Sequence, residues 1–208
     1  PAAVAGEDVT LPVALAVPGL HNARNATAAI LAAIELGMPA QDAARAASTF
    51  LGAARRFQIR GTVGAVTVVD DSKTHSTEIG ALLDAARRRY PDATIHVLFQ
   101  PHLFSRTRFF APQFAQALAK ADDVIVTGVF PARERQEDFP GVDAHTIADA
   151  AAEGATPIDV VEDMATAAQM VAMRAKPGDV IFTVGAGDIT TMGPVIVHVL
   201  EAHHGKDA

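Results

Sequence analysis

From residue 66 onward, short apolar runs alternate along the chain with segments of helical periodicity. The runs predict strands over residues 66–70, 94–99, 123–127, 158–161 and 180–184. Apolar residues at helical spacing predict helices over 79–86, 110–118, 147–153, 164–175 and 192–200. Repeated strand–helix units fold into a mostly parallel sheet with helices on both faces. We therefore expect an α/β domain with a Rossmann-like sheet and flanking helices.

The part of the chain before this alternation has a different pattern. Residues 1–19 predict an extended segment that ends at Pro18-Gly19, and two Ala-rich helices follow over 21–37 and 39–54. The segments 57–62 and 66–70 alternate like two strands joined by a turn. We therefore divide the chain near Arg56, into a helical part of residues 1–56 and a self-sufficient α/β domain of residues 57–208.

Composition narrows the classes of function. The net charge of −7 argues against a protein that binds the phosphate backbone of nucleic acid. The absence of Cys excludes disulfides and thiolate metal sites and suits a reducing cytoplasm. No apolar stretch approaches the roughly 20 residues of a membrane span, and no spacing of His and Glu indicates a metal site. The start lacks both a Met and a signal-peptide pattern, so we expect a fragment of a longer chain.

The strand predicted at 66–70 ends in a cluster of polar side chains, namely Asp70, Asp71, Ser72, Lys73 and His75. In open α/β sheets, ligands bind at the carboxyl ends of the strands. Adjacent acids there can hold ribose hydroxyls or Mg²⁺, and a lysine can neutralise phosphate or carboxylate. The alternative is a solvated turn in which Ser76 caps the next helix and Glu78 complements its dipole.

Two further loops follow strand ends. Residues 100–108 carry two Arg with a Ser and a Thr, which suits an anionic ligand, although a helix-entry loop with exposed cations explains them equally well. Residues 185–188, Gly-Ala-Gly-Asp, can bring backbone N–H groups against an anion. The third glycine of the dinucleotide fingerprint is missing because position 190 is Thr, which argues against a Rossmann dehydrogenase and favours a tight turn.

Two observations concern nucleotides. His21, Asn22 and Asn25 lie around a predicted helix start, where amides cap the helix or read an adenine edge. No G-x-x-x-x-G-K-[ST] phosphate loop is present, so the chain alone offers no evident cradle for a nucleoside triphosphate.

Taken together, these segments resemble the Mur ligase family of ATP-dependent amide ligases in cell-wall synthesis. Residues 17–26 are similar to the family's Pro-Gly-x-His-Asn-x-x-Asn-Ala segment, and residues 55–57 to its Arg-Arg-Phe. Phe99-Gln-Pro-His-Leu-Phe-Ser-Arg-Thr resembles a block that is fairly specific to the members that add L-alanine. Residues 130–134, 140–142 and 185–189 resemble the family's later loops.

The resemblance implies a function for the intact enzyme. Family members have a nucleotide-sugar domain, a central ATPase and a C-terminal α/β domain, so residues 1–56 would be the end of the ATPase and residues 57–208 the C-terminal domain. The chemistry is formation of an acyl phosphate on the muramyl carboxylate, followed by attack of an amino group. ATP and Mg²⁺ would be bound mainly by the rest of the central domain, and the substrates would be UDP-N-acetylmuramate and L-alanine. A cytoplasmic role in peptidoglycan synthesis, cell shape and division follows, with the fragment inactive alone and with neither nucleic acid nor membrane as partner.

The resemblance also assigns roles to residues. It places His21, Asn22 and Asn25 near adenine, and Arg56 and Asp71 at ribose and phosphate. The catalytic groups facing the amino acid and the muramyl carboxylate would be His75, His102 and Arg106. Substrate binding would fall to Ser72, Lys73, Arg106 and Arg108.

The segment 70–78 departs from the pattern of the alanine-adding members, which usually read Asp-Asp-Tyr-[Gly/Ala]-His-His-Pro-Thr-Glu. Here Ser72, Lys73, Thr74 and Ser76 stand at changed positions, and Asp71-Ser72-Lys73 instead resembles the ligases that add D-glutamate. Leu103 stands where a basic residue is common in those members, and Lys73 would replace this lost cation. Two alternatives stay open: another amino-acid-adding Mur ligase, against which the block at 99–107 argues, and a non-catalytic module that binds a muramyl nucleotide.

Overall fold

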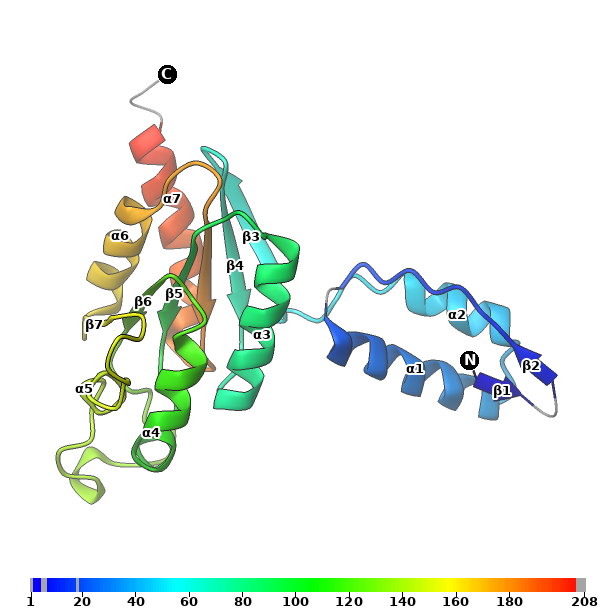
Figure 1. The fold of residues 1–208 in the computed structure, drawn as a ribbon, viewed down its shortest axis with the longest axis horizontal. Coiled ribbons are helices and arrows are strands. Elements are labelled where there is room, and N and C mark those ends of the chain that lie inside the picture. The colour runs from blue at the N-terminus through cyan, green and yellow to red at the C-terminus, as the bar shows by residue number, and fades with distance from the viewer. Residues whose placement is uncertain (1, 5–6, 18, 205–208) are drawn as a thin grey trace. The chain divides into compact units, whose positions relative to one another are not determined.

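The computed structural model describes residues 2–4, 7–17 and 19–204, and the chain divides into two compact units, Pro1–Ala53 and Ala54–Ala208 (Figure 1). The first unit contains an antiparallel hairpin of β1 (Ala2–Val4) and β2 (Glu7–Val9), followed by helices α1 (Leu20–Glu35) and α2 (Ala40–Ser48). The predicted extended segment therefore contains a hairpin, and its Pro18 lies outside the described residues. The second unit begins at Ala54, three residues before the boundary that we expected, and whether the first unit is the end of an ATPase domain stays a prediction.

Both helices of the first unit form where the sequence predicts, but α2 ends six residues early. The Ser48 hydroxyl donates to the Ala44 carbonyl and the Thr49 hydroxyl donates to the Ala46 carbonyl. These bonds satisfy carbonyl groups that a helix end leaves without partners. Large apolar side chains remain exposed in this unit, including Leu36 at 89% and Leu51 at 86%.

A six-stranded sheet in the order β3-β4-β8-β5-β6-β7 forms the centre of the second unit. Its strands are β3 (Gln58–Val63), β4 (Val66–Asp71), β5 (Ile95–Phe99), β6 (Asp123–Val126), β7 (Ile158–Val160) and β8 (Val180–Val184). All neighbours pair in parallel except β3, which is antiparallel to β4. The predicted mostly parallel α/β fold is confirmed.

Helices cover both faces of the sheet (Figure 1). One face packs against α3 (Ser76–Arg89), α4 (Phe104–Leu118) and α5 (His145–Ala148), and the other against α6 (Met164–Arg174) and α7 (Met192–His204). Within β8, Phe182 joins the first core and Ile181 the second. A strand buried on both faces reads as a continuous apolar run, which is why the sequence shows these strands clearly.

The predicted helices occur with shifted bounds. Helix α4 begins at Phe104, six residues before the predicted range, and α5 is a single turn that ends at Ala148. Two short 3-10 helices, Gln136–Asp138 and Asp188–Thr191, complete the unit. Within the ranges that the structure describes, no helix is long and apolar enough to cross a membrane.

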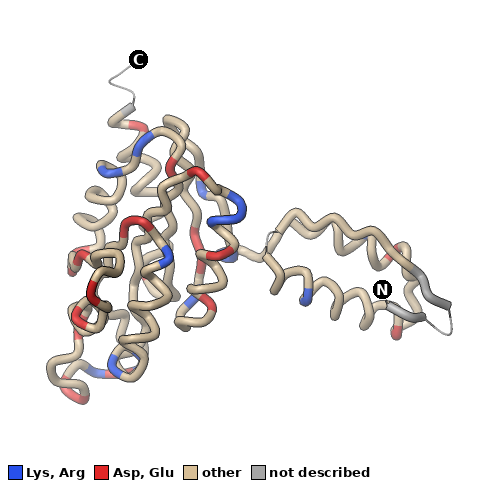
Figure 2. Tube along the Cα trace, in the orientation of Figure 1, with Lys and Arg blue, Asp and Glu red and all other residues tan. Residues whose placement is uncertain are grey.

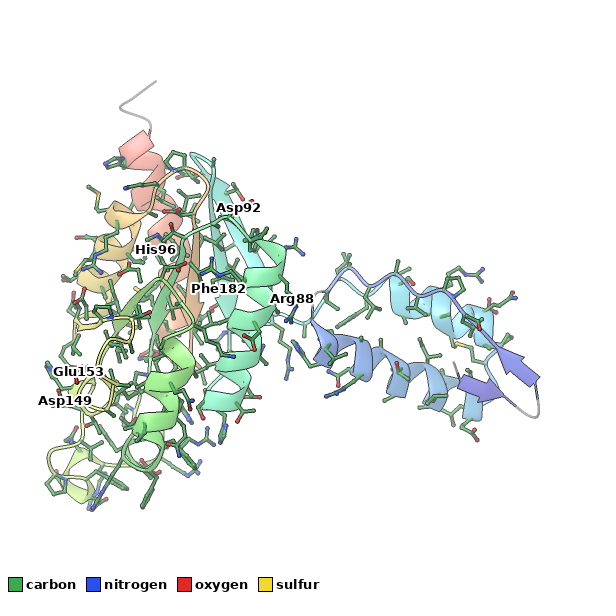
Figure 3. All side chains as sticks on the ribbon, in the orientation of Figure 1. Arg88, Asp92, His96, Asp149, Glu153 and Phe182 are labelled. Atoms are coloured by element: carbon green, nitrogen blue, oxygen red, sulfur yellow. The ribbon has the colours of Figure 1, made fainter. Side chains whose placement is uncertain are left out.

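An ionic network joins the amino ends of the central strands. His96, near the start of β5 (Figure 3), places Nδ1 2.8 Å from Asp123 Oδ2 and Nε2 3.1 Å from Asp179 Oδ2. Arg174 of α6 donates to Asp123 and to Asp159 at 2.8 and 2.6 Å. The network therefore fastens β5, β6, β7 and the turn before β8 at the edge opposite to the polar loops described next.

Candidate functional site

The carboxyl ends of β4, β8 and β5 are adjacent in the sheet, and the three polar loops predicted from the sequence follow these strands. Gly185 N–H, after β8, donates to the Asp71 carbonyl at 3.0 Å, and Gln100 N–H, after β5, donates to the Val184 carbonyl at 2.9 Å. The three loops therefore lie together at one edge of the sheet.

Asp70 is fully buried at this edge, and both of its carboxylate oxygens are engaged. Oδ1 accepts from the Thr183 hydroxyl at 2.9 Å and Oδ2 from the Thr190 hydroxyl at 2.7 Å. Arg55 Nε lies 3.5 Å from Oδ2. A buried carboxylate with this set of donors has a structural role, because its lone pairs already serve groups of the protein.

Asp71 is also fully buried and is the centre of a second set of donors. Lys73 Nζ lies 3.0 and 2.9 Å from the two carboxylate oxygens, Lys73 N–H donates to Oδ1, and Phe57 N–H donates to Oδ2. These donors occupy the positions that a metal ion would need. Neither carboxylate fits Mg²⁺, and in the described part of the chain no three metal-ligating side chains cluster.

The loop after β8 is packed too closely to admit larger residues. A Cβ on Gly185, whose φ is +144°, would lie 2.7 Å from the Gln100 carbonyl oxygen, and a Cβ on Gly187 would lie 2.5 Å from the ring of Phe130. The Ile189 N–H donates to Gln100 Oε1. The N–H groups of Gly185 and Ile189 thus serve the protein itself, which supports the tight-turn interpretation over an anion cradle.

The start of α4 approaches the loop after β4. Arg106 Nη1 donates to the Thr74 hydroxyl at 3.0 Å, and the ring of His75 lies 5.3 Å from that of Phe110. The ring of His102 stacks on Phe130 with centroids 5.9 Å apart. The structure therefore brings the segment 74–75 next to the segment 102–106. The three side chains that we predict to be catalytic belong to these two segments.

His102 has an environment that disfavours its charged form. Burial is the main cause that lowers its pKa from the ordinary 6.5, and the cations Arg106 and Arg133 lower it further, against a weaker opposite effect of Glu134. Its Nδ1 is buried and makes no hydrogen bond within the described residues. The imidazole is therefore neutral near pH 7, with an unpaired ring nitrogen.

The structure also places three further predicted residues, Ser76, Arg108 and Arg56. The N-cap of α3 is His75, whose Nδ1 accepts from Thr77 N–H, so the prediction that Ser76 caps this helix is wrong. Arg108 is exposed and lies two positions beyond Arg106 in α4, which places the two side chains on different sides of the helix. Arg56 is exposed.

The three residues predicted near adenine belong to the first unit. His21, Asn22 and Asn25 all lie inside α1, whose N-cap is Gly19 and has no side-chain capping bond. None of the three is therefore the N-cap residue of α1, and a contact with adenine stays a prediction.

Sequence reasoning missed several residues that organise the site, namely Arg55, Gln100, Phe130, Thr183 and Thr190. One signal was available: Thr183 is the single polar residue in the otherwise apolar strand Val180–Val184. The others act through contacts between distant segments, which no local pattern reveals.

A doubly wound sheet with polar loops at its carboxyl edge defines the class of α/β domains that bind a ligand at that edge. Within this class, the chain belongs to the Mur ligase family, because the family described as "Mur ligase, glutamate ligase domain" matches residues 55–187.

Known relatives agree with this assignment. The UDP-N-acetylmuramate–L-alanine ligase of Bifidobacterium longum subsp. infantis is 68% identical over 209 residues, which cover 98% of this chain and 41% of that protein. The enzyme of the same name from Paenarthrobacter aurescens is 50% identical over 186 residues, or 89% of this chain and 39% of that protein. The chain thus spans about two fifths of the length of these relatives.

Solved structures show the same fold. The UDP-N-acetylmuramate–alanine ligase of Thermotoga maritima superposes with a TM-score of 0.78 at 28% identity, over 95% of this chain and 42% of that one. A murein peptide ligase from Psychrobacter arcticus gives a TM-score of 0.67 at 26% identity, over 90% of this chain and 38% of that one.

Proposed function

We propose that this chain is the ligase part of an ATP-dependent enzyme that joins L-alanine to UDP-N-acetylmuramate in cytoplasmic peptidoglycan synthesis. The observation that carries the proposal is the 68% identity to a ligase of that name over nearly the whole chain. Because the chain spans 41% of that relative, it would act together with nucleotide-sugar and ATPase segments and would be inactive alone.

Arg106 and His102 would perform the chemistry at the carboxyl edge. Attack of an amine on an acyl phosphate concentrates negative charge on the phosphate and the carbonyl oxygen, and a guanidinium beside them stabilises that charge. Arg106 donates to the Thr74 hydroxyl, and this bond would hold the guanidinium in place for that role. His102 is partly exposed and neutral near pH 7, so its imidazole would accept the proton of the attacking amine.

Lys73 would bind a carboxylate of the substrates. Its ammonium has three N–H donors, and Asp71 takes at most two of them, so one remains for a ligand. Ser72, His75 and the exposed Arg108 would contribute nearby polar contacts. Lys73→Ala should then raise the KM for L-alanine, and an unchanged KM would reject this role.

The nucleotide would be held mainly by segments outside this chain. Arg56 is exposed and would contact a phosphate of ATP, whose bound form supplies the activating phosphoryl group. Asp71 would act on the ribose through the segment that it fixes, since its own oxygens are engaged, and Mg²⁺ would be bound elsewhere. Adenine contacts by His21, Asn22 and Asn25 belong to this proposal as well.

The test is a chimera in which this chain replaces the matching segment of the Bifidobacterium longum subsp. infantis ligase. Phosphate release from ATP is measured with UDP-N-acetylmuramate, Mg²⁺ and one amino acid at a time. We expect release with L-alanine and none with D-glutamate. Release with D-glutamate alone would favour another amino-acid-adding ligase.

One observation favours a second candidate. Ser72, Lys73, Thr74 and Ser76 replace groups that the alanine-adding members usually carry, as in a module that binds a muramyl nucleotide without turnover. A chimera that binds UDP-N-acetylmuramate in calorimetry but releases no phosphate with any amino acid would support this module over the ligase.

A further inference from the structure

Arg55 connects three segments of the carboxyl edge within the second unit. Its backbone has a φ of +58°, its N–H donates to Gln58 Oε1 at 2.9 Å, and its carbonyl accepts from Ser72 N–H at 2.8 Å. Its guanidinium donates from Nη2 to the Gly185 carbonyl at 2.6 Å and from Nη1 to the Ala186 carbonyl at 3.3 Å. The side chain thus reaches the loop after β8, while its backbone holds the loop after β4.

The guanidinium of Arg55 is also paired with a buried charge. Its Nε lies 3.5 Å from Asp70 Oδ2, and Asp70 itself is fixed by Thr183 and Thr190. The planar guanidinium donates to two carbonyls and lies beside a carboxylate, with no hydrogen bond from Nε to any described residue, and an ammonium cannot reproduce this geometry. Arg55 therefore has a rigid partner on β4 and two backbone partners on the loop after β8.

Phe57, two residues after Arg55, is packed against the core of the domain. Phe57 has a φ of +51°, and its ring packs edge-on against Phe182 of β8 with centroids 5.3 Å apart (Figure 3). Arg89, in the arginine-rich last turn of α3 (Figure 2), lies over the outer side of the Phe57 ring at 5.8 Å. With Arg55 and Phe57 both anchored inward in left-handed conformations that side chains seldom adopt, the segment presents Arg56 to solvent.

We propose that Arg55 is a positioning residue that fixes the segment 55–57 on Asp70 and on the Gly185–Ala186 carbonyls, so that Arg56 is aimed at a phosphate of the bound nucleotide. The inference rests on the proposed function for the identity of the ligand. It assigns to Arg55 no contact with substrate: its effect on the reaction passes through Arg56.

The kinetic test uses the chimera and a double-mutant cycle. We expect Arg55→Gln and Arg56→Gln each to raise the KM for ATP at least tenfold, and the double variant to exceed either single variant by less than threefold. Arg88→Gln, an exposed arginine of α3, should change the KM less than twofold. If Arg55 served stability alone, Arg55→Gln would lower kcat and the melting temperature and leave the KM for ATP unchanged, which would overturn the proposal. If the fold increases in the KM for ATP of the two single variants multiply in the double variant, the proposal is overturned as well.

A second measurement does not depend on activity. Hydrogen exchange of the Ser72 and Gly185 amides in the 208-residue chain should be at least tenfold faster in Arg55→Gln than in Arg88→Gln. Equal exchange rates in the two variants would refute the positioning role of Arg55. Arg55→Lys keeps a cation beside Asp70 and replaces Arg55→Gln if the latter does not fold. A chimera without L-alanine-dependent hydrolysis would reject the proposed function, and the exchange rates would then decide the positioning role by themselves.

Discussion

The network around His96 predicts a stability that depends on pH in a definite direction. Both ring nitrogens face carboxylate oxygens, and a neutral imidazole has one N–H, so only the protonated ring can donate to Asp123 and Asp179 together. Burial alone would lower the pKa of His96, but hydrogen bonds and the charges of the two aspartates outweigh it and raise the pKa above 6.5. The stabilisation is therefore fully present below pH 6.5 and is lost as the pH rises through the raised value.

The aspartates set the acid limit of the same network. The hydrogen bond from His96 is the main cause that lowers the pKa of Asp123, with Arg174 adding to it against burial. For Asp179, burial raises the pKa, but bonds from Lys176 N–H and His96 outweigh it and lower the pKa below 3.8. Their stabilisation is present above pH 3.8 and is lost as the pH falls through the lowered values, so the network contributes most between about pH 4 and 6.5.

Replacing His96 by Ala removes two charge-assisted hydrogen bonds, each contributing roughly 1.5–3 kcal/mol. Because Asp123, whose side chain is 22% exposed, regains water, we expect a net loss of about 2–4 kcal/mol in the free energy of unfolding at pH 6, and about 1 kcal/mol at pH 9. Urea denaturation at both pH values measures the difference.

The matched control for this experiment is Lys120→Ala, which removes a pair with Asp84 whose side chains are 44% and 49% exposed. It should cost less than about 1 kcal/mol at either pH. An equal loss for His96→Ala at pH 6 and pH 9 would refute the reasoning, because it would show that the charge of the ring contributes nothing.

Three further predictions concern packing and association. Gly187→Ala should lower the free energy of unfolding by about 1–3 kcal/mol in urea denaturation, because the new Cβ would meet the Phe130 ring at 2.5 Å; an unchanged midpoint would show that the ring moves freely. Thr127→Val should leave the free energy of unfolding unchanged or raise it by up to about 1 kcal/mol, since the buried hydroxyl has no hydrogen-bond partner in the described residues. Thr107→Val, which breaks a 2.9 Å hydrogen bond, should instead lower it by about 1 kcal/mol. Equal effects of the two substitutions in urea denaturation would contradict this prediction. The full chain should associate in analytical ultracentrifugation through the exposed apolar residues of its first unit, and residues 54–208 should not; monomers of both at high concentration would rule this out.

The parts of the fold that the sequence predicts are those determined locally. The apolar run that stops at Asp70 locates β4, and Gly64 followed by Ala65 locates its hairpin turn. The order of the strands in the sheet is not determined locally, because β8 lies between β4 and β5 through pairings that join residues more than 80 positions apart. The same limit applies to the site: Asp71 and Lys73 are neighbours in sequence and were predicted together, while Arg55 acquires its role only by contact with residues near position 185.

The order of the strands also has a consequence for how the protein is made. The ribosome synthesises β4 and β5 long before β8, yet those two strands hydrogen-bond to β8 and not to each other. Until residue 184 has left the ribosome, the nascent chain therefore lacks the middle strand of its sheet. The two partial sheets, β3-β4 and β5-β6-β7, then each expose an unpaired edge. We expect this domain to fold only after β8 has left the ribosome, in one late step, and to need protection from aggregation until then.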